Sequence, residues 1–461
     1  MKTLMNKLCL TIIILFIFLR LSKGNISLPE IFSDNMVLQQ KSEVILWGWA
    51  KTGEVVVVTT DWLNTGLSAK ASDQGTWRLI LKTPEAGGPY NIHIKGYNEL
   101  TLKNVLIGEV WLCSGQSNME WSAQAGINNG EEEIKSATYP DIRFFTVYNA
   151  TSPYPQDHFM GKWTGCTPEE MRKFSAIGYF FARKLHRELG VPVGIINSSW
   201  GGTPAEAWMP EDLIRKDNFL SVAASMQKPV PWGPVGAGRI YNSMISPMIP
   251  FRIAGVLWYQ GEANTINAYA YKELLSGLIK SWRSNWGYDF PFYYAQIAPY
   301  KYGRPFEGVE VRDAQRKVLE VANTGMVVLS DIGDTLDIHP KNKLDAALRF
   351  ASLALNRYYK KSAIEDSGPL YKGMIVDKNK IIVSFDHSEG LHATGDKISC
   401  FEIAGDDKVF YPADAKIKGQ QVIIQSKKVK LPVAVRFAWS NTATPNLING
   451  VNLPASCFIT E

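Results

Sequence analysis

Two side chains that lie far apart in the sequence have the chemistry of an acyl-transfer pair. Ser117 lies in the run Cys-Ser-Gly-Gln-Ser-Asn-Met-Glu over residues 113–120, and His339 ends the run Ser-Asp-Ile-Gly-Asp-Thr-Leu-Asp-Ile-His over residues 330–339. A serine hydroxyl becomes a nucleophile when a histidine accepts its proton, and an aspartate can orient that histidine. The two runs therefore contain the side chains that ester hydrolysis needs.

Two further polar runs contain groups that can hold an oxyanion. Residues 197–208 read Asn-Ser-Ser-Trp-Gly-Gly-Thr-Pro-Ala-Glu-Ala-Trp, and residues 260–264 read Gln-Gly-Glu-Ala-Asn. Glycine-rich backbone and amide side chains are suitable donors for this purpose. Each run by itself also fits an ordinary turn or helix cap. The functional interpretation depends on all four runs lying together.

The elements before these runs predict that they do lie together. Apolar segments of strand length alternate with amphipathic segments, which is typical of β-α units and a parallel sheet. The predicted strands are 105–112, 192–196, 253–259, 292–297 and 326–329, and the predicted helices are 175–189, 269–286, 310–321 and 343–359. In such a sheet the ligand crevice lies at the carboxyl ends of the strands. All four polar runs follow a predicted strand.

Short β-rich segments flank this α/β region. At 461 residues the chain exceeds the size of one ordinary domain. Short β-branched or aromatic runs at 43–49, 54–60, 75–81 and 90–94 predict a small sandwich, and alternating strands return after residue 362. We predict a signal peptide at 1–24, a β-sandwich-like domain at 25–103, an α/β catalytic domain at 104–361 and a β-rich domain at 362–461.

The four runs together resemble those of the sialate O-acetylesterases, a branch of the SGNH hydrolases. Ser117 lacks the second glycine of the Gly-x-Ser-x-Gly elbow, which argues against an ordinary α/β-hydrolase. The resemblance covers nearly the whole chain after residue 24. It implies a parallel sheet with helices on both faces, flanked by β-sandwich-like parts.

The resemblance also implies catalytic roles. It makes Ser117 the nucleophile, His339 the base and Asp337 the acid partner. The broader SGNH pattern places the acid three residues before the histidine, where this chain has Leu336. Asp334 is therefore a second candidate for the acid.

Further site residues follow from the same resemblance. The oxyanion donors would be the backbone amide of Ser117, a glycine amide from Gly201 or Gly202, and a side-chain amide from Gln260 or Asn264. Substrate-binding roles fall on Gln116, Asn118, Trp200 and Glu262.

The resemblance implies removal of acetyl groups from an O-acetylated glycan or sialic acid, without a cofactor. An acetylxylan esterase is an alternative. A glycosidase that uses Glu120 and Glu262 would leave the contexts of Ser117 and His339 unexplained. A third alternative is a carbohydrate-binding protein with an inert α/β domain.

The remaining features concern location and partners. Lys2 and Lys7 precede an apolar stretch at 8–19, which predicts a cleaved signal peptide, no membrane span after its removal, and a secreted or periplasmic protein. Cys113, Cys166, Cys400 and Cys457 would remain, with no pairing readable from their spacing. No metal-ligand motif is present, and the net charge of +5 is too dispersed to indicate a nucleic-acid partner. The sequence does not predict an oligomeric state.

Overall fold

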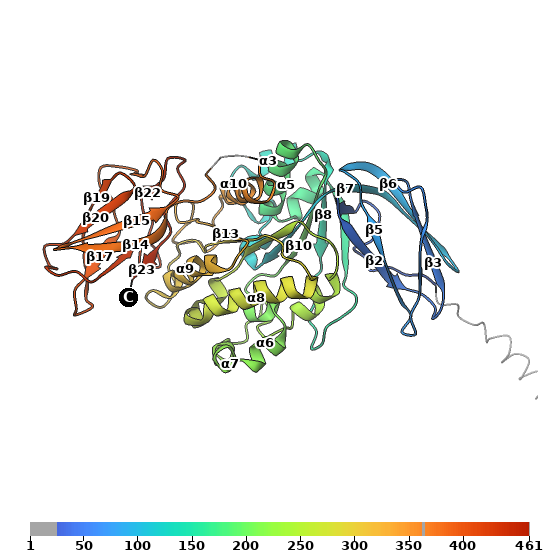
Figure 1. Ribbon diagram of the computed structural model, residues 1–461, viewed down its shortest axis with the longest axis horizontal. Coiled ribbons are helices and arrows are strands. Elements are labelled where there is room, and N and C mark those ends of the chain that lie inside the picture. The colour runs from blue at the N-terminus through green and yellow to red at the C-terminus, as the bar shows by residue number, and fades with distance from the viewer. Residues whose placement is uncertain (1–24, 362–364, 461) are drawn as a thin grey trace, which may run out of the picture.

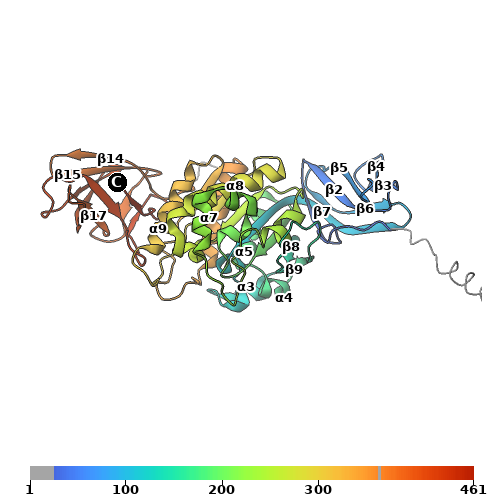
Figure 2. The ribbon, with the colours of Figure 1, turned by 90° about the horizontal axis from the view of Figure 1, so that it is seen from below.

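Three parts follow one another along the long axis of the molecule. The computed structural model describes residues 25–361 and 365–460, so the predicted signal peptide lies outside the described residues. Figures 1 and 2 show a β-rich N-terminal part, a central α/β part and a β-rich C-terminal part in that order.

The central part is a seven-stranded path in the order β13-β12-β11-β7-β10-β8-β9. The pairs from β13 to β8 are parallel, and β9 is an antiparallel edge strand. The strands are β7 Glu99–Gly115, β8 Tyr139–Val147, β9 Gly161–Cys166, β10 Val193–Ser199, β11 Gly255–Tyr259, β12 Phe292–Ala295 and β13 Thr324–Val327. The predicted α/β fold class is confirmed.

Helices cover both faces of this sheet. Figure 1 shows α5 and α10 on one side of the sheet and α8 and α9 on the other. The helices are α2 Ser117–Glu120, α3 Gly130–Ser136, α4 Pro168–Lys173, α5 Ala176–Leu189, α6 Glu211–Lys216, α7 Asn218–Ser225, α8 Tyr271–Trp286, α9 Glu307–Lys317 and α10 Lys343–Leu353, which continues as a π-helix at Ala354–Tyr358.

The sequence did not predict strands β8 and β9. Pro140 stands near the start of β8, and proline removes a ladder donor and argues against a central strand. The structure accommodates Pro140 where the β8–β9 register shifts, between Tyr139 and Arg143. Glycines at both ends of Gly161–Cys166 weaken the strand signal of β9 in the same way.

The N-terminal part places two sets of strands over a shared core. The strands are β1 Val37–Gln39, β2 Glu43–Trp49, β3 Val55–Thr60, β4 Leu67–Lys70, β5 Thr76–Lys82 and β6 Gly87–Lys95. Alternate residues of β2, β3 and β5 are buried, as expected for strands with one face on a core.

One long strand joins the N-terminal part to the catalytic sheet. The first half of β7 pairs with β6, and its second half pairs with β10 and β11. The predicted boundary between residues 103 and 104 lies within this strand. A continuous hydrogen-bonded strand makes the junction stiff, unlike a flexible linker.

The C-terminal part has its own core. Its strands are β14 Leu370–Asp377, β15 Lys380–Asp386, β16 His392–Ala393, β17 Phe401–Ala404, β18 Phe410–Pro412, β19 Asp414–Lys418, β20 Gln421–Gln425, β21 Ala434–Phe437, β22 Leu447–Ile448 and β23 Phe458–Ile459. Val309 of α9 joins this core, so the C-terminal strands rest on a helix of the central part.

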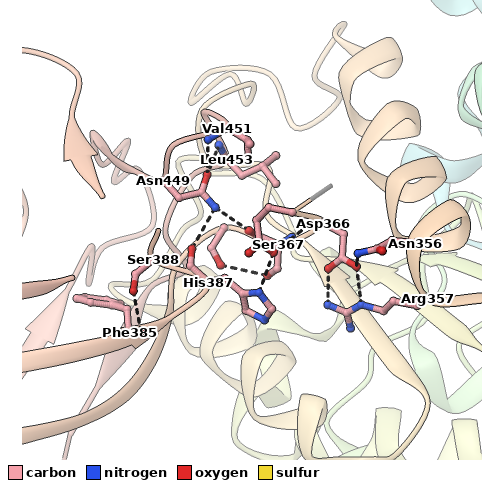
Figure 3. A network of polar contacts seen from close by, with 12 residues as sticks. Asn356, Arg357, Asp366, Ser367, Phe385, His387, Ser388, Asn449, Val451 and Leu453 are labelled. Carbon is pink, nitrogen blue, oxygen red and sulfur yellow. Dashed lines mark hydrogen bonds and ion pairs between the residues drawn. The ribbon is translucent and has the colours of Figure 1, made fainter. Parts of the chain in front are cut away.

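Polar contacts hold the same junction (Figure 3). Asp366 accepts hydrogen bonds from Asn356 and from both Nε and Nη2 of Arg357, at 2.6–3.0 Å. Asn449 donates to the carbonyls of Ser367 and His387 at 2.9 and 3.1 Å. These contacts fix Asp366 and Ser367, which lie directly before β14.

Candidate active site

The polar runs converge on a pocket at the carboxyl ends of the central strands. Strands β10 and β11 flank β7 on opposite sides, so the end of β7 is the point at which the strand order reverses. A cavity of about 650 Å³ lies there, and its lining includes Gln116, Ser117, Glu120, Trp121, Asn149, Trp200, Gly201, Gly202, Trp232, Glu262, Ala263 and His339. The four runs predicted to share one edge of the sheet thus contribute to one pocket.

Ser117 and His339 contact each other directly. The distance from Nε2 of His339 to Oγ of Ser117 is 2.9 Å, across 222 positions in the sequence. Ser117 is the first residue of α2, directly after the turn that ends β7. For Nε2 to accept the serine proton, the ring proton must lie on Nδ1.

The environment of His339 favours the neutral imidazole. Burial lowers the pKa of His339 below its usual value of 6.5, and the charge of Lys343 lowers it further, while Asp337 opposes both effects. The indole of Trp121 stacks on the imidazole, with 4.1 Å between ring centroids and 17° between planes. A stacked ring restricts the orientation of the imidazole, and a neutral imidazole is the form that accepts a proton.

Asp337 is the nearer of the two candidate acids. Its Oδ1 lies 3.8 Å from Nδ1 of His339, which is longer than a hydrogen bond. The same oxygen accepts the backbone N–H of His339 at 2.9 Å, so its hydrogen bond holds the loop rather than the ring. Asp334 instead accepts the backbone N–H of Leu336 at 2.8 Å.

A buried network lies beneath this pair and connects its two loops. Asn118 donates to Glu262 at 2.6 Å and to the carbonyl of Ile338 at 3.0 Å, and it accepts from Nζ of Lys343 at 2.6 Å. Because Asn118 follows the serine and Ile338 precedes the histidine, the network sets the distance between Ser117 and His339. Asn118 is buried and does not line the pocket, so its predicted substrate-binding role is not supported by this placement.

Burial shifts both titratable members of the network toward neutrality. It lowers the pKa of Lys343 to about 7, against the opposing charges of Glu262 and Asp337. It also raises the pKa of Glu262 above its ordinary value. No sequence motif singled out Lys343, although it stands only four residues after His339.

The side-chain amides predicted as oxyanion donors are used elsewhere. Gln260 donates to the carbonyl of Thr203 and to Oδ1 of Asn264, at 3.2 and 2.7 Å. Asn264 donates to Glu206 at 2.8 Å and to Asn267 at 3.1 Å. Both amides are fully buried, and neither residue lines the pocket. In this structure they join the loops after β10 and β11 to each other.

Backbone amides are better placed for the oxyanion. Because Ser117 starts α2, its N–H has no acceptor within the helix. Gly202 lies on the pocket wall with a φ of +71°, whereas the amide of Gly201 donates to Oε2 of Glu120 at 2.8 Å. Gln116 also lines the pocket, and its Oε1 accepts from Ala263 at 3.3 Å.

The aromatic residues near the polar runs divide into two groups. Trp208, Trp258 and Tyr259 are almost completely buried in the core. Trp121, Trp200 and Trp232 line the pocket. Trp232 was not predicted as a site residue, because it lies outside the four polar runs, in a loop far from any predicted strand end.

Other sequence expectations concern cysteines, metals and membranes. Cys113, Cys166, Cys400 and Cys457 are all free thiols. Among the described residues, no group of three or more His, Cys, Asp or Glu side chains is arranged to hold a metal ion. Within residues 25–361 and 365–460, no helix has the length and hydrophobicity of a membrane span.

The comparisons with known proteins agree with this geometry. A family model described as carbohydrate esterase, sialic acid-specific acetylesterase matches residues 107–354. The sialate O-acetylesterase of Mus musculus is 27% identical, over 93% of this chain and 92% of that protein. The sialate O-acetylesterase of Homo sapiens is 26% identical, over 81% of this chain and 78% of its own length. A carbohydrate acetylesterase from Xanthomonas citri has a structure with a TM-score of 0.86 and 36% identity, over 95% of this chain and 99% of that one.

The parallel sheet and the Ser117–His339 pocket at its carboxyl edge define an ester hydrolase, as the SGNH resemblance implied. The match over residues 107–354, more than half of the chain, gives the family. This chain belongs to the carbohydrate esterase family of sialic acid-specific acetylesterases.

Proposed function

We propose that this chain is a secreted or periplasmic carbohydrate O-acetylesterase that removes acetyl groups from sugars, with sialic acid as the preferred substrate class. Ser117 is the nucleophile, His339 the base and Asp337 the acid partner. The observation that carries the proposal is the 2.9 Å contact between Nε2 of His339 and Oγ of Ser117, inside a pocket lined by residues from all four polar runs.

In the first half of the reaction, Oγ of Ser117 attacks the acetyl carbonyl while Nε2 of His339 takes its proton. The backbone amides of Ser117 and Gly202 stabilise the oxyanion. The C–O bond to the sugar then breaks, and the sugar leaves as an alcohol with the proton from His339.

In the second half, water attacks the acetyl-serine while His339 accepts a proton from it. The tetrahedral intermediate collapses to acetic acid, which loses its proton to solvent as acetate, and His339 returns the proton that it took from water to Ser117. The cycle requires a nucleophile, a base, oxyanion donors and a pocket for the leaving sugar. No redox or group-carrying cofactor takes part in this scheme.

The first prediction tests the nucleophile against a nearby serine. Ser117→Ala should lower kcat for p-nitrophenyl acetate by several orders of magnitude, as removal of a triad serine does. Ser114→Ala is the matched control. Ser114 is fully buried, and its hydroxyl has no hydrogen-bond partner among the described residues. The control should retain kcat within about threefold, and a comparable loss at Ser114 alone would contradict the assignment.

The substrate class needs a separate measurement. Acetate release is compared between O-acetylated sialic acid and acetylated xylan at equal ester concentration. The proposal expects a higher kcat/KM on the sialic acid. A preference for xylan would show that the substrate is a neutral glycan and not sialic acid. The proposed esterase chemistry would be unaffected by that result.

A further inference from the structure

One wall of the catalytic pocket is a loop that carries no catalytic group. Residues 226–237 follow α7, and the pocket-lining side chains of this loop are Gln227, Lys228, Val230, Trp232 and Val235. A β-bridge between Val230 and Gly233 closes its tip. The loop is also anchored to both neighbouring walls, because Trp200 donates to the carbonyl of Trp232 at 3.1 Å and Gln227 donates to the carbonyl of Ala263 at 3.3 Å.

Trp232 presents an open aromatic surface beside the nucleophile. Trp232 is 63% exposed, whereas the other tryptophans among the described residues are buried or half-buried. Its ring lies against Gly202, where an added Cβ would stand 2.1 Å from Cδ1 of the indole. A Cβ at Gly201 would stand 3.3 Å from Cβ of Ser117, so the ring and the nucleophile border the same glycine turn. An exposed indole held in this position is suited to contact a bound ligand.

Lys228 adds an unpaired positive charge to the same loop. It is exposed, and within the described residues no carboxylate or hydrogen-bond partner engages it. The two carboxylates that line the pocket each accept a hydrogen bond from the protein, Glu120 from Gly201 and Glu262 from Asn118. A free ammonium at the pocket rim favours a ligand that carries negative charge.

On the basis of the proposed esterase function, we propose that Trp232 and Lys228 form the subsite that selects the sugar. The indole of Trp232 stacks on the apolar face of the sugar ring, and the ammonium of Lys228 pairs with the carboxylate of an acidic O-acetylated sugar. The acetyl group then lies between Ser117 and the Gly201–Gly202 turn. The catalytic groups thus act on the ester, while the 226–237 loop determines which sugar carries it.

Three esters separate these contributions. They are p-nitrophenyl acetate, an O-acetylated sialic acid, and the same sugar with its carboxylate converted to a methyl ester. Acetate release gives kcat/KM for each. The readout is selectivity, defined as kcat/KM for a sugar divided by kcat/KM for p-nitrophenyl acetate in the same variant.

Trp232→Ala should lower selectivity for both sugars by at least about fivefold, because the stacking surface is lost. Trp232→Phe should restore most of it, since a smaller aromatic face remains. The matched control is Tyr154→Ala, because Tyr154 is 74% exposed and lines a different groove of the molecule. Unchanged selectivity in Trp232→Ala, or an equal loss in Tyr154→Ala, would overturn the stacking role.

Lys228→Gln should lower selectivity for the acidic sugar by about fivefold and leave that for the methyl ester within twofold. It should also weaken the salt dependence of kcat/KM for the acidic sugar. Lys280→Gln, in the same groove as Tyr154, is the control and should change neither value. An equal loss for both sugars, or no loss, would overturn the ionic role. A wild-type protein that releases acetate from none of the three esters would contradict the proposed function and, with it, this subsite.

Discussion

At the scale of single residues, the site depends on how far Asp337 supports His339. A triad aspartate is usually buried and bonded to Nδ1 of the histidine. Here the Asp337 side chain is 44% exposed, and the distance from its Oδ1 to Nδ1 is 3.8 Å. Such contacts can shorten when substrate binds.

We therefore expect Asp337→Asn to lower kcat by about 10 to 100-fold, which is less than the roughly 10⁴-fold loss at a buried triad aspartate. Asp334→Asn is the control, because that carboxylate accepts the backbone N–H of Leu336 in its own turn. It should retain kcat within about twofold. If Asp337→Asn also retains full activity, the enzyme works as a Ser117–His339 dyad. If Asp334→Asn is the damaging change, the acid role moves to Asp334.

The pH dependence of kcat/KM tests the electrostatic effect of the buried Lys343 on His339. The proposed mechanism needs neutral His339, so kcat/KM should fall as the pH drops through the pKa of that residue. Because burial and Lys343 lower this pKa, the acid midpoint should lie below 6.5. In Lys343→Met the positive charge is gone, so the midpoint should move upward by a few tenths of a unit to about one unit.

Lys343→Met should also lower kcat by about 10 to 100-fold, because Asn118 loses a hydrogen-bond donor and the loops that carry Ser117 and His339 shift. Lys341→Met, at an exposed position of the same loop, should change neither quantity. If the role of Lys343 were purely structural, Lys343→Met would lower the free energy of unfolding without moving the acid midpoint of kcat/KM. An unmoved midpoint would therefore contradict the electrostatic effect.

At the scale of elements, the turn between β7 and α2 requires a glycine. Gly115 has a φ of +127°, and an added Cβ would lie 2.2 Å from the backbone oxygen of Tyr259. That same oxygen accepts the N–H of Gln116 at 2.9 Å. The close approach of β7 and β11 therefore positions the nucleophile.

Gly115→Ala should lower both the free energy of unfolding and kcat, because the backbone of Tyr259 must move. Gly190→Ala is the matched control. Gly190 ends α5 with a φ of +67° and has no atom within 4 Å of an added Cβ. The control should lose about 1 kcal/mol of stability and no kcat. Urea unfolding and ester turnover of both variants test this, and equal stability losses would show that the Tyr259 contact is unimportant.

At the scale of the whole molecule, the N-terminal and C-terminal parts are attached to the central part in different ways. The N-terminal part shares strand β7 with the catalytic sheet, whereas the C-terminal part depends on Val309 and on side-chain contacts such as Arg357–Asp366 (Figure 3). The polar junction is thus the more sensitive to single substitutions.

Asp366→Asn should lower the free energy of unfolding by about 1–3 kcal/mol, because the half-buried guanidinium of Arg357 loses its counter-charge. The control is Lys372→Gln, which breaks an exposed pair with Asp386 and should cost less than about 1 kcal/mol. Neither variant should change turnover of p-nitrophenyl acetate. Equal stability losses would contradict a special role for the Arg357 contact.

The amino-acid sequence by itself determined five of the seven strands of the central sheet, all but β8 and β9, and which polar runs meet. Strands β10 to β13 begin within about three residues of their predicted starts. The carboxyl ends of parallel strands share one edge, so runs as distant as Ser117 and His339 had to lie together. That inference needed only hydrophobic periodicity and chain order.

Only the tertiary structure decided what each polar side chain does. Gln260 and Asn264 looked like oxyanion donors, but their amides bond to Thr203, Glu206 and Asn267. Buried amides must satisfy their hydrogen bonds, and the partners come from loops that sequence order does not pair. Trp232 likewise reaches the pocket through contacts between segments that are distant in the sequence. Its position is set by contacts with Trp200 and Gly202, which no local pattern encodes.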